Sequence, residues 1–516
     1  MDEAAIHARR WWTLGVMCLS LMVIGVDNTI LNVALPTLVR DLHATTSQLQ
    51  WIVDAYTLVF AGLLLSAGSL GDRFGRRRGL TVGLVVFGVG SVASALVGSP
   101  NHLIATRALM GIGGALIMPA TLSIISNVFT VPAERARAIA VWAGFSAMGI
   151  ALGPLAGGWL LQHFWWGSVF MVNIPIVTLA VVGGRLFVPE SKDPSPRGLD
   201  LVGALLSIVG LVVLVWGIIE APGRGWTQPA TLGSFLLAAV LLGSFVAWEM
   251  HSDHPMLDVQ FFANPRFTAA SMAITLVFFA LFGSMFLQTQ YLQFVLGYTA
   301  LQAGLRVGPV AIVLMIAAPL SARLVERVGT KVVVASGLAI VSASLVVLSL
   351  ATATSGYGPV LASMLIMGIG MGMTMAPATE SIMGSLPRAK AGVGSAVNDT
   401  TRQIGGALGV AILGSLLAST YRSSLGTTAS AAARASVGGA LEVARGIGGA
   451  QGAALARAAK AAYVDGMSVG VLVAAGVALL GAFIALVFLP SRAKEEAIAP
   501  AEEEAIEDAG LEVATA

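Results

Sequence analysis

The sequence has few charged residues. Asp, Glu, Lys and Arg make up 11% of its 516 residues, whereas soluble proteins contain roughly 25%. Hydrophobic residues account for 56% of the chain, and its mean hydropathy is +0.85. A chain of this length and composition cannot be a multidomain soluble enzyme, so we expect most of it to lie in a lipid bilayer.

Other chemistry is missing as well. The single cysteine, Cys18, excludes an internal disulfide, and a net charge of +2 gives no electrostatic preference for nucleic acid. No lysine follows a glycine, so the phosphate-binding loop of ATPases is absent. The six histidines are scattered and show no metal-ligand spacing. We therefore expect no enzymatic activity, no cofactor, no metal and no nucleic-acid partner.

Long apolar runs are abundant. A helix needs about 20 apolar residues to cross a bilayer. Fourteen runs of this kind are present: 12–35, 49–70, 79–98, 102–128, 137–161, 168–188, 200–219, 230–249, 267–293, 304–325, 332–352, 358–385, 396–419 and 466–489. They predict an all-α membrane protein with fourteen spans.

Lys and Arg are unevenly divided between the loops on the two sides of the membrane. Nineteen fall on one side, among them Arg73, Arg76, Arg77 and Arg78, whereas the short loops of the other side hold about three. Cytoplasmic loops carry the excess of Lys and Arg. We therefore predict a multi-pass protein of the cell membrane with both termini in the cytoplasm.

A short signal recurs along the chain. The segment Gly68–Arg78 (GSLGDRFGRRR) has a degenerate copy at Ala322–Lys331 (ARLVERVGTK), eight runs later. Weak repetition of this kind is typical of transporters built from two related halves. The predicted organisation is as follows: a cytoplasmic N-terminus (1–11), a six-helix half (12–188), two extra helices (189–260), a second six-helix half (261–489) with a partly helical outer loop (420–464), and an acidic, disordered cytoplasmic tail (490–516).

Four motifs resemble those of a known family. Gly68–Arg78 is similar to the loop signature of the major facilitator superfamily, and Leu103-x-x-x-Arg107-x-x-x-Gly111-x-Gly113 resembles its fourth-helix motif. Gly149–Gly158 resembles the fifth-helix motif of antiporters, and Asp27–Pro36 resembles the first-helix motif of fourteen-span drug:proton antiporters. The resemblance implies the major facilitator fold and an exporter of lipophilic, often cationic compounds driven by the proton gradient or the membrane potential.

Three charged residues lie inside the predicted spans. Asp27 is about 22 Å along the first helix, where an ionised carboxylate costs at least about 2.5 kcal/mol. Asp54 and Arg107 lie toward the outer face of the membrane. Asp27 and Asp54 could therefore face one cavity, where repulsion between the two carboxylates would favour proton binding by one of them. We predict proton coupling by these three residues and substrate contact by Asp27 and Asp54. Structural hydrogen bonding and ion pairing are the alternatives.

Two motifs suggest gating. Asp72, beside Arg73, Gly75, Arg76 and Arg77, could meet the helix N-terminus near 394–396 and latch the inner side closed. A purely topological role for the arginines is the alternative.

The fifth-helix motif offers small residues and a helix-interrupting proline. Gly153, Pro154, Gly157 and Gly158 predict a helix that packs closely and bends. Ordinary close packing is the alternative.

The second half offers weaker candidates. Glu380 is its best candidate for contacting a cationic substrate. Asp399 and Arg402 are three residues apart and are expected to pair on one helix face. Phe278, Phe279, Phe282 and Phe286 recur at helical spacing, where they line a cavity or pack against lipid and helices.

These observations predict a monomeric, proton-coupled multidrug efflux antiporter that binds small lipophilic or cationic compounds in the bilayer. Three alternatives remain open: a narrow exporter of a self-made antibiotic or metabolite, a proton-coupled uptake symporter, and a receptor or scaffold that transports nothing.

Overall fold

The computed structural model describes residues 3–192, 199–386, 391–426 and 429–490, which are helical apart from the connecting segments. The helices, in chain order, are α1 (Glu3–Leu42), α2 (Thr46–Phe74), α3 (Arg76–Leu96), α4 (Pro100–Val128), α5 (Pro132–His163), α6 (Ser168–Met171), α7 (Asn173–Phe187), α8 (Leu201–Arg224), α9 (Pro229–His251), η1 (Val259–Ala263), α10 (Pro265–Gln290), η2 (Tyr291–Val295), α11 (Ala300–Val307), α12 (Pro309–Val328), α13 (Thr330–Ser349), α14 (Gly358–Met383), α15 (Ala391–Leu425), α16 (Ala431–Ala435), α17 (Val437–Ile447) and α18 (Gly449–Phe488).

Fourteen candidate membrane spans are present in the described residues, which confirms the predicted number. The sixth, ninth and tenth spans each combine two consecutive elements: α6 with α7, α10 with η2, and α11 with α12. The region 420–464 is largely helical, because α15 continues to Leu425 and the 40-residue α18 already begins at Gly449. The acidic tail from 491 onward lies outside the described residues.

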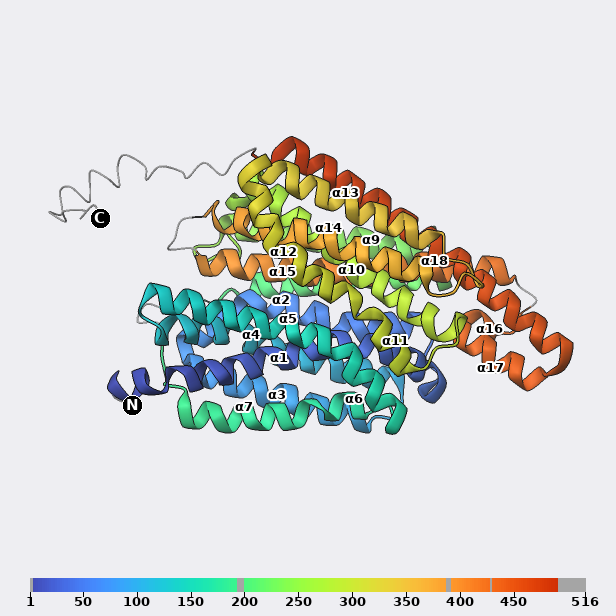
Figure 1. Ribbon diagram of the computed structural model, residues 1–516, viewed down its shortest axis with the longest axis horizontal. Helices are drawn as coiled ribbons and strands as arrows, with labels where there is room; N and C mark the ends of the chain where they lie inside the picture. The colour runs from blue at the N-terminus through green and yellow to red at the C-terminus, as the bar shows by residue number, and fades with distance from the viewer. Residues whose placement is uncertain (1–2, 193–198, 387–390, 427–428, 491–516) are drawn as a thin grey trace.

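The helices form two halves with an added pair at the edge. Helices α1–α7 form one half and α10–α18 the other. Helix α8 packs against α2 and α15, one helix from each half, while α9 packs mainly against α8. Helix α1 begins and α18 ends at the same end of the bundle, here called the terminal end (Figure 1). Helices α16 and α17 lie at the opposite end, here called the hairpin end.

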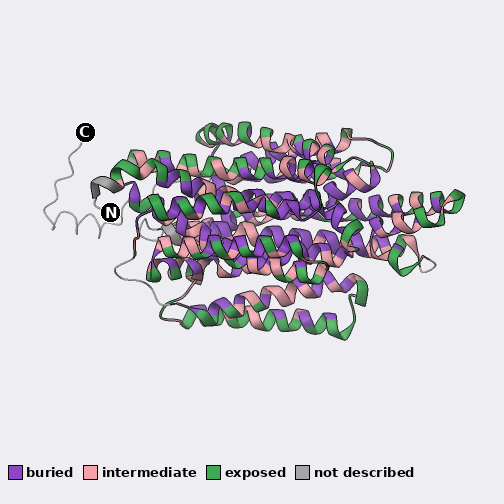
Figure 2. Ribbon diagram, turned by 90° about the horizontal axis from the view of Figure 1, so that it is seen from below, coloured by how far each residue is buried: buried purple, intermediate pink, exposed green. Residues whose placement is uncertain are grey.

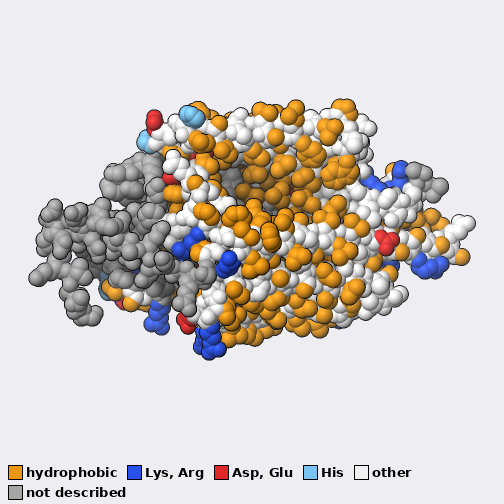
Figure 3. Space-filling view, turned by 90° about the horizontal axis from the view of Figure 1, so that it is seen from above, with side chains coloured by type: hydrophobic (Ala, Val, Ile, Leu, Met, Phe, Trp, Pro, Cys, Tyr) orange, Lys and Arg blue, Asp and Glu red, His pale blue; other side chains and the backbone are white. Residues whose placement is uncertain are grey.

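Burial and surface chemistry fit a protein that spans a bilayer. Buried residues gather along the middle of the bundle, and exposed ones lie on its outside (Figure 2). On the face seen in Figure 3, hydrophobic side chains cover the middle of the molecule, whereas charged side chains gather toward its two ends. An apolar band between two polar ends is the surface that a bilayer stabilises.

Side-chain amides join the halves near the hairpin end. Gln50 Nε2 of α2 donates to the carbonyl oxygens of Val410 and Ala411 in α15, at 3.2 and 2.8 Å. In the reciprocal direction, Gln293 Nε2 of η2 donates to the carbonyl oxygen of Val33 in α1, at 2.9 Å. Such hydrogen bonds between helices hold the two halves together where the bilayer offers no competing partner.

Candidate functional site

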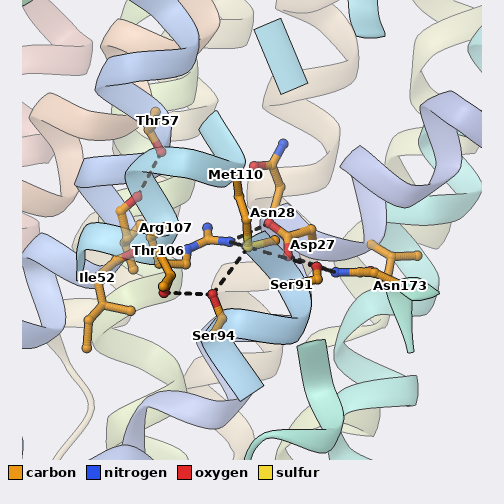
Figure 4. A network of polar contacts seen from close by, with 12 residues as sticks. Asp27, Asn28, Ile52, Thr57, Ser91, Ser94, Thr106, Arg107, Met110 and Asn173 are labelled. Atoms are coloured by element: carbon orange, nitrogen blue, oxygen red, sulfur yellow. Dashed lines mark hydrogen bonds and ion pairs between the residues drawn. The ribbon is translucent and has the colours of Figure 1, made fainter. Parts of the chain in front are cut away.

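A buried ion pair lies inside the N-terminal half. Arg107 Nη1 of α4 is 2.6 Å from Asp27 Oδ2 of α1, and the two side chains are 1% and 0% exposed. Asn173 at the start of α7 donates from Nδ2 to Asp27 Oδ1 at 3.2 Å. Figure 4 shows Arg107 and Asn173 approaching Asp27 from different helices. Both carboxylate oxygens therefore have partners, which removes most of the cost of burying the charge.

The same guanidinium also holds α2. Arg107 Nε donates to the carbonyl oxygen of Ile52 at 3.1 Å, and Arg107 Cζ lies 4.4 Å from the centre of the Tyr56 ring. In this conformation Arg107 therefore binds an acid and a backbone carbonyl at the same time. Gly111, one turn further along α4, makes the approach possible, since a Cβ there would lie 2.6 Å from the carbonyl oxygen of Tyr56.

A small cavity adjoins Arg107 between the two halves. Its volume is about 10 Å³, which is the space of about one water molecule. It is lined by Asn28, Leu31, Asn32, Val53, Thr57 and Arg107 from the N-terminal half and by Phe282, Gln403, Gly406 and Val410 from the other. Of the four phenylalanines noted in the sequence, Phe282 lines this cavity. A conformational opening is required before a drug-sized molecule can enter.

Asp54 is buried apart from this ion pair. It is 0% exposed, and neither carboxylate oxygen has a hydrogen-bond partner among the described residues. It lies on α2 one turn after Gln50, which binds α15, and one turn before Leu58, which packs against α8 and α15. Positions i, i+4 and i+8 share one helix face, so Asp54 faces the junction of α2, α8 and α15.

The expectation that Asp27 and Asp54 face one cavity is wrong for this conformation. Their neighbours Asn28 and Val53 line the cavity, but neither carboxylate does. Asp27 is turned toward Arg107 and Asn173 instead.

The described charged residues of the C-terminal half lie outside the cavity lining. The predicted pairing of Asp399 with Arg402 is confirmed, with Arg402 Nη1 3.8 Å from Asp399 Oδ1. Arg402 Nη2 also donates to Thr379 Oγ1 of α14 at 3.4 Å. Glu380 is exposed three residues before the end of α14, so its expected contact with a cation remains a prediction.

The loop signature folds onto the segment that follows α7. Asp72 Oδ1 accepts from Arg76 Nε at 2.7 Å, and the expected contact of Asp72 with residues 394–396 is not made within the described part of the chain. The backbone N–H of Arg77 donates to Glu190 Oε1 at 3.1 Å. Gly75 joins α2 to α3 at φ 118°, a conformation that L side chains rarely adopt. The latching contact of Asp72 with residues 394–396 therefore stays a prediction.

Arg73 takes no part in that contact. Its guanidinium carbon lies 5.6 Å from the ring centre of Phe74, which is exposed. This placement favours a topological role for Arg73.

The fifth-helix motif packs α5 against both halves. A Cβ at Gly153 would collide with Thr29 Oγ1 of α1, and one at Gly157 would lie 2.7 Å from Ile30 Cγ1. A Cβ at Gly158 would lie 2.6 Å from Leu301 Cα of α11, and the carbonyl oxygen of Pro154 lies against Gly304 of the same helix. The motif therefore lets α5 approach α1 on one side and α11 of the other half on the other.

Three residues of the site were missed in the sequence. Asn173 binds Asp27, Tyr56 stacks on Arg107, and Gln403 lines the cavity. The available signal was an amide within an apolar span, which is costly without a partner. That signal holds for Asn173 and Gln403 but says nothing about Tyr56.

The described residues form a bundle with fourteen candidate membrane helices in two halves, and an ion pair is buried beside a cavity between the halves. This arrangement defines a membrane transporter. Comparison with known proteins agrees with this class. Residues 17–410 match the family model of the Major Facilitator Superfamily. The chain belongs to the major facilitator superfamily, and its fourteen spans fit the drug:proton antiporter type.

Its relatives include efflux proteins. The multidrug efflux pump LfrA of Mycolicibacterium smegmatis is 37% identical over 482 residues, covering 92% of this chain and 95% of that protein. The tetracenomycin C resistance and export protein of Streptomyces glaucescens is 32% identical over 498 residues, covering 94% and 92%. The methyl viologen resistance protein SmvA of Salmonella typhimurium is 34% identical over 478 residues, covering 92% and 97%. The chain is therefore an efflux transporter of the cell membrane and not an enzyme.

Solved structures agree on the fold. A bacterial homologue of the human lysosomal transporter Spinster superposes with a TM-score of 0.64 at 18% identity, covering 94% of this chain and 99% of that one. A peptide transporter of the POT family in complex with sulfate gives a TM-score of 0.64 at 16% identity, covering 94% and 97%. At these identities the comparison concerns the fold alone.

Proposed function

We propose that the chain is a proton-coupled multidrug antiporter that exports lipophilic, cationic compounds, with both termini in the cytoplasm. The Asp27–Arg107 pair carries the proposal. An ion pair excluded from solvent at 2.6 Å is stable only while both charges are present. Proton binding to Asp27 would leave Arg107 without its counter-charge and so make a second arrangement of the helices favourable.

The position of Arg107 supports an exchange of a proton for a cation. Arg107 lines the cavity between the halves, whereas Asp27 lies behind it. While Asp27 is ionised it neutralises Arg107, and the cavity accepts a cationic compound. Once Asp27 is protonated, the uncompensated charge of Arg107 repels that compound. Asp54, whose oxygens have no partner in the described residues, is the carboxylate available to a cation as the cavity opens.

The energy then comes from the proton gradient and not from a bound cofactor. With the termini in the cytoplasm, the halves are joined near the outer face, by Gln50 and Gln293, in the conformation described here. Alternating access would break these contacts and close the latch at Asp72.

The test is transport into inverted membrane vesicles under an imposed pH gradient, with ethidium as the cationic probe. Asp27→Asn is expected to abolish gradient-driven uptake while the protein is still inserted. Asp41→Asn, an exposed position on the same helix, is the matched control and should transport normally. Full transport by Asp27→Asn would exclude Asp27 from the coupling mechanism.

A narrow exporter is the second candidate, because the chain is 32% identical to a tetracenomycin C resistance and export protein. Accumulation of a panel of cationic dyes and antibiotics, in a host that lacks its own exporters, separates the two. Export of several unrelated compounds supports the multidrug function, whereas export of one chemical class supports the narrow one. Transport in the opposite direction would indicate an uptake symporter.

A further inference from the structure

Two acidic side chains meet at the terminal end of the added helix pair. Asp200 is the N-cap residue of α8, and Glu249 lies in the last turn of α9. They are only 8% and 3% exposed. One oxygen of each carboxyl group lies within 2.6 Å of the position that a Cβ on Gly203 would take. Burying two acidic groups this close together is costly, and the transport site at Asp27 does not account for it.

Backbone and indole N–H groups fix the orientation of both carboxyls. Asp200 Oδ1 accepts from the backbone N–H of Gly203 at 2.7 Å and from Trp248 Nε1 at 2.9 Å. Glu249 Oε2 accepts from the backbone N–H of Leu257 at 3.0 Å. The other two oxygens, Asp200 Oδ2 and Glu249 Oε1, are buried and have no donor among the described residues.

These two oxygens face the same position beside Gly203. A Cβ built on Gly203 would lie 2.6 Å from Asp200 Oδ2 and 2.6 Å from Glu249 Oε1. Two ionised carboxylates this close repel each other strongly, and a buried acceptor without a donor costs about 1–3 kcal/mol. A single proton between the oxygens removes both costs, because a protonated carboxyl donates to the neighbouring carboxylate.

Among the residues that the structure describes, no positive charge pairs with either acid. His251, Asp253 and His254, at the end of α9 and just after it, are exposed to solvent. Within the described residues, none of the other ionisable groups on α8, α2 and α15 forms an ion pair with Asp200 or Glu249: Glu220 and Arg224 on α8, Asp54, Asp72 and Arg73 on α2, and Asp399, Arg402 and Arg422 on α15. Asp258, after α9, is a further acid and adds no positive charge. The proton is thus the counter-charge that the geometry supports.

We propose that Asp200 and Glu249 bind one proton between them, at a site separate from Asp27, and that this proton fastens the base of the α8–α9 pair. Asp200 caps α8, Trp248 and Glu249 belong to α9, and Leu257 belongs to the linker that leads into the C-terminal half. The linker also contacts the N-terminal half, where Ser66 Oγ of α2 donates to Met256 Sδ at 3.1 Å. Loss of the proton sets two carboxylates against each other where the pair is tied to both halves.

Trp248 supplies a built-in reporter. Its indole N–H donates to Asp200, so its fluorescence responds to the charge of the pair. The experiment is a pH titration of tryptophan emission of the full-length transporter in detergent. The Trp248 signal is isolated by subtracting a Trp248→Phe variant, which removes one of ten tryptophans. We expect a one-proton transition that is lost in Glu249→Gln and in Asp200→Asn, since Asn still caps a helix.

Two further variants separate the proton site from unspecific effects. Glu220→Gln, on the same helix and paired with Arg224 at 3.6 Å, is the matched control and should keep the transition. Gly203→Ala leaves every ionisable group in place but forces the two oxygens apart, so it should move the transition to lower pH. If gel filtration shows that either carboxyl variant fails to fold, Gly203→Ala still tests whether the transition belongs to the Asp200–Glu249 pair.

A transition that persists unchanged in Glu249→Gln and Asp200→Asn, or a wild type without any transition, would overturn the proposal. A signal that follows added Na⁺ or Ca²⁺ at constant pH would also overturn it, because the oxygens would then form a metal-cation site. These outcomes do not depend on transport, so they leave the proposed function untouched.

Discussion

Arg107 binds Asp27 of α1 through Nη1 at 2.6 Å and, through Nε, the carbonyl oxygen of Ile52 of α2 at 3.1 Å. One guanidinium on α4 therefore ties together the two helices that carry Asp27 and Asp54. Both bonds are excluded from solvent. A change of charge at Asp27 consequently alters the packing of three helices and not of one side chain.

Removing the acid alone should destabilise the protein. Asp27→Asn leaves the Arg107 charge buried without a counter-charge, and breaking a buried pair in this way costs about 3–5 kcal/mol. We expect a clear fall in the melting temperature of the detergent-purified variant. Thermal unfolding followed by tryptophan fluorescence measures it.

The double variant Asp27→Asn with Arg107→Met is the control. Replacing both charges by groups of similar size is often nearly neutral, so most of the lost stability should return while transport does not. If the double variant recovers gradient-driven transport, the pair serves packing alone. If Asp27→Asn melts like the wild type, the pair contributes little to the fold.

Tyr56 should act through its ring and not through its hydroxyl. Arg107 Cζ lies 4.4 Å from the ring centre, whereas the buried hydroxyl has no hydrogen-bond partner among the described residues. We expect Tyr56→Phe to transport normally and Tyr56→Leu to lose about 2 kcal/mol of stability, the contribution of a desolvated cation–π contact. Parallel melting and transport assays test this pair of variants. An equal loss of transport in Tyr56→Phe and Tyr56→Leu would mean that the hydroxyl has a partner in another state of the transport cycle.

The number of spans was predictable because it depends on apolar length alone. Asp27 and Arg107 were also predictable as functional candidates, since a charge inside an apolar run is costly wherever it occurs. Their pairing was not predictable. The two residues are 80 positions apart, and Asp54 was an equally good partner on the basis of depth in the membrane.

The choice between the two acids depends on how the helices are rotated about their axes. Gly111 lets α4 approach the carbonyl oxygen of Tyr56, and this approach sets which face of α2 meets α4 and which meets α8 and α15. The close packing of α4 against α2 at Gly111 thus leaves Asp54 on the face of α2 that is turned away from Arg107. Helix depth can be estimated from a sequence, but the rotation of each helix results from packing with all its neighbours.

Gly158 should control how closely the two halves meet. A Cβ there would lie 2.6 Å from Leu301 Cα and 2.8 Å from the carbonyl oxygen of Ala300, and a backbone cannot yield as a side chain can. We expect Gly158→Val to push α11 away from α5 and to reduce efflux severalfold. The separation of the halves can be followed with cysteines that replace Thr46 and Ala435. In the native protein Thr46 Oγ1 donates to the carbonyl oxygen of Ala435 at 3.0 Å. In the Gly158→Val variant, these two cysteines should cross-link less with a short thiol reagent.

Gly144 on the same helix is the matched control, because a Cβ there would meet nothing within 4 Å. Gly144→Val should leave both efflux and cross-linking unchanged. An equal effect of the two substitutions would assign the loss to helix propensity and not to the contact between α5 and α11.

Asp54 should affect substrates unequally. Its carboxylate is buried and has no hydrogen-bond partner among the described residues, so Asp54→Asn removes no native contact and should leave the melting temperature unchanged or raise it. A cation that reaches the junction of α2, α8 and α15 loses its counter-charge in this variant. We therefore expect efflux of some cationic compounds to fall severalfold while that of others persists.

Gln50→Ala is the control, because it removes a neutral contact between the halves one turn away. It should slow the efflux of all substrates alike. Accumulation assays with mono- and divalent cationic dyes compare the two variants. A uniform or absent effect of Asp54→Asn would assign Asp54 to the fold and not to substrate binding.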